Sequence, residues 1–304
     1  MKVIAPLTMT DAILTSSNVP ETDAPAWRGG TTYAAGAEVI VLATHRVYRS
    51  VIAGNIGNNP VTDDGTRWLD LGFTNRWRVF DGKVSALTEQ TGSIVYEITP
   101  TTFVSGVGFI NLGAKIVRVE CFDATSTLIY SAEIDRFENS AIIDYYTFFT
   151  VDLTREDTSD VIFDDVKGFP GNRLVITMGG VNPLANVTVG QIVLGVAYDL
   201  GVALSNTAIG IRDFSSKGRD VFGNAVIVER AFADTVTFQF TLRSDQARRV
   251  RAILAGLRAT PALYYAGADM SRFGAQAFGF FQDFEIPLDA GGQSFANLKI
   301  EGLT

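Results

Sequence analysis

The amino-acid sequence predicts a mainly β protein that combines a small β module, an antiparallel β-sandwich and a C-terminal β domain with one α-helix. Three observations support this class. Short apolar stretches recur with turn residues between them, and 29 glycines accompany 21 phenylalanines among the 304 residues. Residues 235–242 alternate polar and apolar side chains without a break, as a half-buried strand does. The helical pattern is confined to one segment, residues 244–258.

Composition and charge restrict the classes of function. The chain is 47% hydrophobic and 19% charged, which is enough apolar material for ordinary cores. Its net charge of −8 provides no general basic field for a phosphate backbone, so we expect no nucleic-acid partner. No run approaches the roughly 18 apolar residues of a membrane span, and the first residues show no signal-peptide pattern. We therefore expect no membrane insertion, and synthesis in a cytoplasm.

Residues 1–25 are rich in Thr, Ser, Pro and Asp. Such a composition favours a loosely structured lead-in over an independent fold. Its apolar residues Ile4, Leu7, Ile13 and Leu14 need a surface to contact. We predict an N-terminal arm that lies on a neighbouring surface.

Residues 26–74 form a compact unit with aromatic residues at intervals, namely Trp27, Tyr33, Tyr48 and Trp68. Two strands are predicted between them, at 36–42 and 47–51, and turn residues follow at 55–59 and 63–65. A unit of this size has a small core, and two tryptophans with two tyrosines are about what that core requires.

Residues 75–204 contain short apolar strands separated by turns, a spacing typical of an antiparallel sandwich. The predicted strands are 93–98, 104–112, 115–122, 127–134, 145–153, 173–177 and 191–200.

Residues 205–304 contain the strand at 235–242 and then the predicted helix. Ser244 and Asp245 suit a helix N-terminus, and Thr260-Pro261 stops the helix. Further strands are predicted at 262–265, 278–288 and 294–301.

The sequence contains few of the residue patterns that catalysis requires. His45 is the one histidine, and its place between two predicted strands indicates an exposed turn residue. Cys121 is the one cysteine and is predicted to be a buried, inert thiol. The sequence has no phosphate-binding glycine loop and no His/Cys metal spacing. We expect no enzyme, no catalytic residue, no metal and no cofactor.

Paired carboxylates are the remaining enzymatic option, because a glycosidase needs two of them at a set separation. The candidate pairs are Asp63/Asp64, Asp164/Asp165 and Asp283/Glu285. Alternation along the predicted strand 278–288 places Asp283 and Glu285 opposite Phe284 and Ile286, in solvent.

The 26–74 unit resembles the small chitin-binding-type carbohydrate-binding modules found on chitinases. The resemblance is carried by its framework positions, Trp27, Tyr33, Gly36, Val39, Tyr48, Pro60 and Trp68. It implies a glycan-binding surface built from Trp27, Tyr33, Tyr48 and Trp68. The alternative is that these four rings are only the module's core. Those modules also carry a sugar-facing tryptophan after the tyrosine strand, whereas residues 50–55 here contain no aromatic.

The remainder of the chain is similar to tail proteins of long-tailed bacteriophages. The segments that carry the similarity are 75–81 (Asn-Arg-Trp-Arg-Val-Phe-Asp), 190–195, 213–215, 220–224, 278–284 and 298–303. It implies a virion protein of the tail tip or baseplate, assembled in the host cytoplasm. The implied partners are other tail and baseplate proteins, further copies of the chain in a trimer or hexamer, and a bacterial surface glycan.

Four functions remain open at this point. The first is a structural tail-tip component that also contributes to attachment on host-surface glycans. The second is a glycan-binding receptor-recognition protein, and the third is a depolymerase of cell-surface polysaccharide. The fourth, a secreted chitin-binding protein, is disfavoured by the absence of an export signal.

Overall fold

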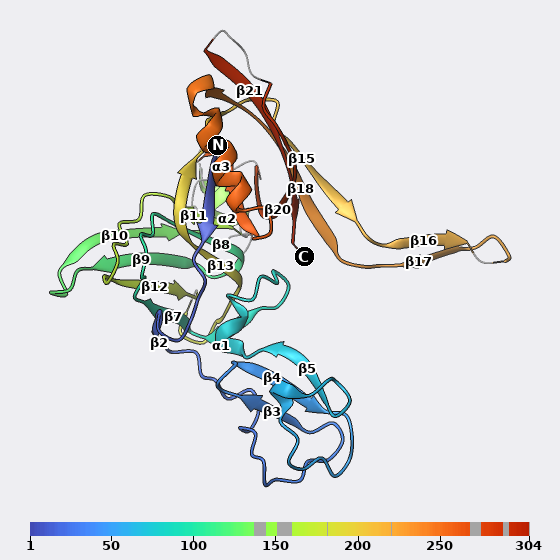
Figure 1. Ribbon diagram of the computed structural model, residues 1–304. Helices are drawn as coiled ribbons and strands as arrows, with labels where there is room; N and C mark the ends of the chain where they lie inside the picture. The colour runs from blue at the N-terminus through green and yellow to red at the C-terminus, as the bar shows by residue number, and fades with distance from the viewer. Residues whose placement is uncertain are drawn as a thin grey trace.

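The computed structural model describes residues 1–136, 144–150, 160–180, 182–219, 221–267, 275–287 and 292–303 (Figure 1). Strands hold 51% of the chain and helices 8%, which confirms the mainly β prediction. Every pairing between the named strands is antiparallel in the described part of the chain. The antiparallel sheets include a curled half-barrel.

The smallest of the three larger sheets belongs to the module at the bottom of Figure 1. Its strands are β3 (Glu38–Val41), β4 (Arg46–Ser50) and β5 (Trp68–Phe73), paired in that order. A short 3-10 helix, η1 (Pro60–Thr62), lies in the loop before β5. The module has its own core, centred on Val39, Tyr48 and Trp68.

A second sheet has five strands and forms one layer of a sandwich. In spatial order they are β10 (Leu128–Asp135), β9 (Ile116–Phe122), β12 (Arg173–Gly179), β7 (Ser93–Ile98) and β2 (Leu14–Ser17). Its inner side chains, such as Tyr96 and Ile176, share one core with Phe109 and Ile192 of the largest sheet. The predicted β-sandwich is therefore present.

The largest sheet has eleven strands. Its main path runs β11 (Val161–Phe163), β8 (Gly106–Gly113), β13 (Asn186–Asp199), β1 (Lys2–Pro6), β19 (Ala262–Tyr265), β20 (Gln276–Glu285), β21 (Gln293–Gly302), β18 (Phe232–Arg243) and β14 (Val202–Ala203). β6 (Thr88–Thr91) pairs with β13, and β15 (Ala208–Asp213) pairs with β18. The sheet therefore joins strands from both sides of the predicted boundary at residue 204.

The lead-in is part of this chain's own sheets, so the prediction of an arm lying on a neighbour is wrong. β1 lies between β13 and β19, and β2 forms the edge of the five-stranded sheet beside β7. The reason is that both faces of β1 are apolar. Val3 packs into the core under α3, and Ile4 packs into a second cluster on the other face. A strand buried on both faces belongs in a sheet interior.

The predicted helix is present with different ends. A 3-10 turn, η3 (Ser244–Gln246), leads into α3 (Ala247–Gly256), which buries Ala247, Val250 and Leu254. Neither start has a side-chain cap. The Ser244 hydroxyl lies 3.0 Å from the Ser294 hydroxyl, so it joins the helix start to β21 instead.

Two other short helices differ from the expectations. α1 (Asn75–Arg78) follows the module directly. α2 (Tyr145–Thr150) occupies most of the segment predicted as a strand at 145–153, so that prediction is wrong for 145–150. Residues 151–153 lie outside the described part of the chain.

A two-stranded ribbon leaves the largest sheet and projects from the body, on the right of Figure 1. It begins where β15 pairs with β18 and continues as β16 (Ser216–Arg219) and β17 (Ala225–Val228). No strands are predicted from the sequence in this region.

Candidate functional site

The four predicted glycan-binding aromatics come together in the module, but two of them are interior. Tyr48 is 6% exposed and Trp68 is 2% exposed, and the Trp68 indole donates a hydrogen bond to the Asn58 carbonyl at 3.0 Å. Rings with so little exposed face cannot stack on a sugar. Tyr48 and Trp68 therefore act as core residues.

Trp27 and Tyr33 are half-buried against that core. The Tyr33 ring lies edge-on to Trp68 at 5.2 Å between centroids. Its hydroxyl accepts a hydrogen bond from the Arg28 backbone N–H at 2.8 Å. Only these two of the four rings retain part of a face for a ligand.

Residues 50–55, where the resembling modules have a sugar-facing tryptophan, carry no aromatic side chain. Ser50 and Asn55 are buried, and the Asn55 amide donates to the Ser50 hydroxyl at 3.0 Å. Val51 and Ile52 are exposed instead. This segment stabilises the module and offers an aliphatic surface.

His45 is not the exposed turn residue that the sequence predicts. It has the left-handed φ of 53° in the β3–β4 turn, and its side chain is only 16% exposed. The ring stacks on Trp77 at 4.1 Å between centroids. No local sequence pattern predicts this stacking, because the Trp77 ring comes from the segment after the module.

Both nitrogens of His45 contact carboxylates of the lead-in. Nε2 lies 2.7 Å from Asp11 Oδ1, and Nδ1 lies 2.8 Å from Glu21 Oε1. Since ionised carboxylates only accept hydrogen bonds, this arrangement is satisfied when both ring nitrogens carry protons. Thr74 donates to the same Glu21 oxygen at 2.9 Å. His45 therefore connects the module to the lead-in and to the segment after it.

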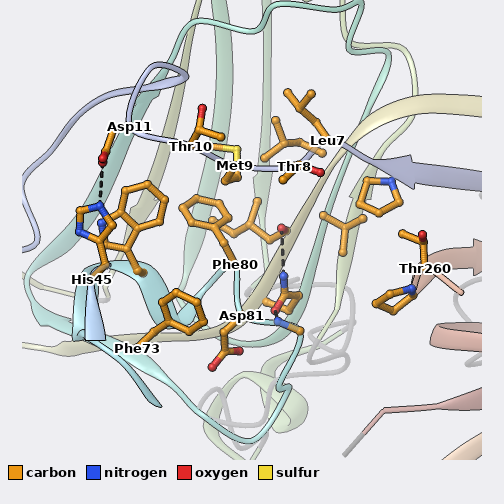
Figure 2. A pocket seen from close by; sticks show the side chains of 18 of the residues that line it. Leu7, Thr8, Met9, Thr10, Asp11, His45, Phe73, Phe80, Asp81 and Thr260 are labelled. Carbon is orange, nitrogen blue, oxygen red and sulfur yellow. Dashed lines mark hydrogen bonds and ion pairs between the residues drawn. The ribbon is translucent and has the colours of Figure 1, made fainter. Parts of the chain in front are cut away.

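A cavity of about 540 Å³ lies at this junction (Figure 2). The lead-in contributes Thr8 and Asp11 to its wall, the module contributes His45 and Phe73, and Phe80 follows the module. The dashed line in Figure 2 marks the contact between Asp11 and His45. Because both His45 nitrogens already contact carboxylates, the ring is not available as a general base.

Asp81 also lines the cavity, and burial raises the pKa of its carboxyl above the ordinary value. Its Oδ1 accepts the Lys83 backbone N–H at 2.7 Å. The next residue, Gly82, donates its N–H to the Gln191 side chain at 2.9 Å. These contacts fix the start of the segment that crosses from α1 to β6.

In the first candidate pair, Asp63/Asp64, both carboxylates accept hydrogen bonds from their own turn. Asp64 accepts hydrogen bonds from the Thr66 hydroxyl and backbone, which lower the pKa of its carboxyl. Asp63 accepts three backbone N–H groups of the same turn, those of residues 65, 67 and 68.

In neither of the other two candidate pairs do the two carboxylates share a contact. Asp164 contacts the Lys2 ammonium at 2.6 Å, whereas Asp165 accepts the Tyr130 hydroxyl at 2.7 Å. Asp283 and Glu285 are exposed on β20, on the side away from Phe284.

Cys121 is buried, as predicted, and burial raises the pKa of its thiol. The thiol donates to the Lys167 carbonyl at 3.3 Å. Across the described ranges, no group of three or more His, Cys, Asp or Glu side chains is placed to hold a metal ion. Within those same ranges, no helix is both long and apolar enough to cross a membrane.

The projecting hairpin, residues 208–232, is the most unusual surface. All of its described residues are exposed except the half-buried Ser215. Nine large hydrophobic side chains lie on it, a third of the 27 that are exposed in the described part of the chain. The nine are Ile209, Ile211, Phe214, Val221, Phe222, Val226, Ile227, Val228 and Phe232.

Both faces of the hairpin are apolar, since consecutive residues Val226, Ile227 and Val228 point to alternate sides. An isolated two-stranded hairpin is marginally stable in water, and apolar patches of this kind mark contact sites. The base is fixed by the Arg212–Glu301 ion pair at 2.7 Å and by the Lys217–Asp213 pair at 2.7 Å. The hairpin is therefore the candidate functional site, and its chemistry is that of a docking element.

Comparison with known proteins adds no family assignment: the chain matches no protein-family model and no curated protein.

Proposed function

We propose that this chain is a non-enzymatic structural component of a bacteriophage tail tip or baseplate, which assembles by protein–protein contacts. The observation that carries the proposal is the projecting hairpin with nine exposed hydrophobic side chains. The tail-protein resemblance of residues 75–304 supplies the setting.

The dimensions of the hairpin support a role in assembly. From Phe214 to the end of β16 at Arg219 it extends about 16 Å at the usual rise of about 3.3 Å per residue. That reach takes the tip beyond the surface of its own body (Figure 1). Val221 is 94% exposed and Phe222 is 86% exposed at the tip. The free energy of the assembly falls when a neighbouring subunit covers such side chains.

The surroundings of the polar groups support the non-enzymatic part. His45 contacts two carboxylates, Cys121 is a buried thiol, and the carboxylates of each candidate pair are bonded separately or lie in solvent. These groups hold loops and strands in place.

Native mass spectrometry of the recombinant chain and analysis of purified phage particles test the proposal. We expect a trimer or hexamer, and the chain in the particles. Val221→Ser with Phe222→Ser should shift the oligomer towards the monomer, while the matched surface change Leu184→Ser, at a site 86% exposed outside the hairpin, should not. A strictly monomeric chain that is absent from particles would contradict the proposal.

Attachment to a bacterial surface glycan is the secondary proposal, and it now depends on Trp27 and Tyr33. Pull-down of the full chain with chitin and with host surface polysaccharide measures it. Trp27→Ala should remove retention. Tyr33→Phe keeps the ring and removes the hydroxyl that Arg28 contacts, so it should retain binding. No retention of the wild-type chain on any of these polymers would end the glycan proposal.

A further inference from the structure

Helix α3 has an outer face that is strongly basic in an acidic protein. Residues 243–258 hold five of the 25 basic residues and one of the 33 acidic residues. This segment has a net charge of +4, which leaves −12 on the rest of the chain. Arg248, Arg249, Arg251 and Arg258 are exposed, and in the described part of the chain no ion pair joins them to a carboxylate.

The geometry of α3 presents these arginines outward. Ala247, Val250 and Leu254 pack onto the inner face of the sheet. The opposite side of the helix carries the small exposed residues Ala252 and Ala255 with arginines on both flanks. Because the alanine side chains are short, the centre of this face can approach another surface closely, with the arginines around the contact.

Two copies of this face repel each other, because both carry several positive charges at short range. A helix-on-helix contact between copies is therefore excluded. The face requires a different, acidic surface.

The outer face of the β20–β21 pair offers such a surface. Asp283 and Glu285 are exposed there, on the side of the sheet away from α3, because their neighbours Phe284 and Ile286 pack towards the helix. Phe295, which is 59% exposed, lies on the outer face of β21. Lys299 lies across from Asp283 and offsets part of the negative charge, but the two carboxylates outnumber it.

Carboxylates beside an exposed aromatic ring are the surroundings that arginine binds best, since its planar guanidinium pairs with the acid and stacks on the ring. The helix face and this acidic face lie on opposite sides of one sheet. A single contact between two copies joins one face of each kind. Contacts of this head-to-tail type form a ring when the rotation between copies closes, and an open filament when it does not.

We propose that the Arg248–Arg251 face of α3 docks on the Asp283/Glu285 face of a second copy of this chain. The inference deepens the proposed function, on which it rests, by naming the partner and the head-to-tail direction of the contact.

Charge exchange tests this contact in the full-length chain. Arg248→Glu with Arg251→Glu lowers the net charge of residues 243–258 from +4 to zero, and Asp283→Arg with Glu285→Arg makes the strand face basic. Glutamate is a good helix former, so α3 should persist; circular dichroism and thermal unfolding check the fold of each variant. Each variant alone then lacks one of the two opposite charges that the contact requires, and its mass in native mass spectrometry should shift towards the monomer. Mixed in equal amounts, the two variants should form heterodimers, because the strand variant keeps the basic helix face and the helix variant keeps the acidic strand face.

A matched control changes the net charge equally without touching either face. Arg28→Glu with Arg67→Glu alters two exposed arginines of the module and should leave the wild-type mass unchanged. The wild-type oligomer should also dissociate as salt rises from about 50 mM to about 1 M, where the Debye length falls to about 3 Å.

Several outcomes would overturn the inference. They are a monomeric wild-type chain at low salt, an oligomer of undiminished mass in either variant alone, and a mixture that forms no heterodimer. Retention of wild-type chain, but not of the helix variant, on duplex DNA or on vesicles containing phosphatidylglycerol, with oligomer mass unaffected, would assign the arginines to another partner. Presence of the chain in purified particles despite any of these results would leave the proposed function standing and remove only this contact.

Discussion

His45 shows how one side chain can join three parts of the chain. Its ring stacks on Trp77, while its nitrogens contact Asp11 and Glu21 of the lead-in. The two carboxylates differ in exposure, since the side chain of Asp11 is 73% exposed and that of Glu21 is 9% exposed. Hydrogen bonds to buried charged groups contribute more than exposed ones. The Glu21 contact should therefore dominate.

This difference gives a first prediction. His45→Ala should destabilise the fold by about 1–3 kcal/mol, because it leaves the buried Glu21 with fewer partners. Glu21→Ala should have a similar effect, and Asp11→Ala should be within about 0.5 kcal/mol of wild type. Urea unfolding of the three variants measures this order. An effect of Asp11→Ala as large as that of Glu21→Ala would show that burial does not govern the junction.

A second prediction concerns Asp81 and pH. Burial raises the pKa of this carboxyl, so the folded chain binds the proton more tightly than the unfolded chain does. The stability that this proton provides is present at low pH and is lost as pH rises through the raised pKa. Asp81→Asn keeps the oxygen that accepts the Lys83 N–H. The variant should be more stable than wild type at neutral pH, by less than about 1 kcal/mol because the group is partly exposed.

Thermal unfolding at several pH values measures the Asp81 effect, and the advantage of the variant should vanish near about pH 3, where both states bind the proton. Asp123 provides a control of opposite sign. The hydrogen bond from the Thr125 side chain lowers the pKa of its carboxyl, so Asp123→Asn should lose stability at neutral pH. The same sign for both variants would rule out the burial explanation for Asp81.

Among the elements, β1 determines how the largest sheet is joined. It pairs with β13 on one side and β19 on the other, so it connects the sandwich to the half of the sheet that packs on α3. Gly195 of β13 allows this close pairing. A Cβ added there would collide with the Ala5 carbonyl oxygen of β1.

The third prediction follows from that contact. Gly195→Ala should destabilise the chain by several kcal/mol, because the displaced backbone of β1 loses hydrogen bonds to both neighbouring strands. Gly218→Ala is the matched control, since a Cβ at that position meets nothing within 4 Å. Chemical unfolding of both variants makes the comparison. Equal stabilities would mean that β1 does not contribute to the folded sheet.

Local patterns predicted elements well where one face is buried. The alternation at 235–242 falls within β18, and the predicted strand at 93–98 coincides with β7. The hairpin, residues 208–232, is not predicted from the sequence. Both of its faces are exposed, so its apolar and polar residues do not alternate between a buried and an exposed side. The left-handed His45 and the placement of β1 depend on residues far away in the sequence, which periodicity does not report.

At the scale of the whole molecule, the chain consists of a packed body and a projecting hairpin with no core of its own. In the described part of the chain, none of the hairpin residues 208–232 belongs to a buried cluster. Folding and assembly should therefore be separable properties. The aromatic module is likewise compact, with its own cluster around Tyr48 and Trp68.

The fourth prediction uses this separation. The Phe214 N–H already bonds the Ala231 carbonyl, at 3.3 Å, so residues 215–230 can be replaced by an Asn-Gly turn. The shortened chain should unfold within about 4 °C of wild type, since it loses little buried area, while its oligomer mass shifts towards that of the monomer. Calorimetry and native mass spectrometry measure the two properties. A large loss of thermal stability would show that the hairpin packs on its own body.

The position of β1 also has a consequence for synthesis on the ribosome. Residues 2–6 are translated long before their partners, which are residues 195–199 and 263–265. Until those segments have been translated, the strand has apolar side chains and unpaired backbone on both edges. Contacts so distant in sequence form slowly, and waiting strands are prone to pair wrongly. The rate at which correctly folded chain accumulates should thus be limited by completion of the strands at 195–199 and 263–265.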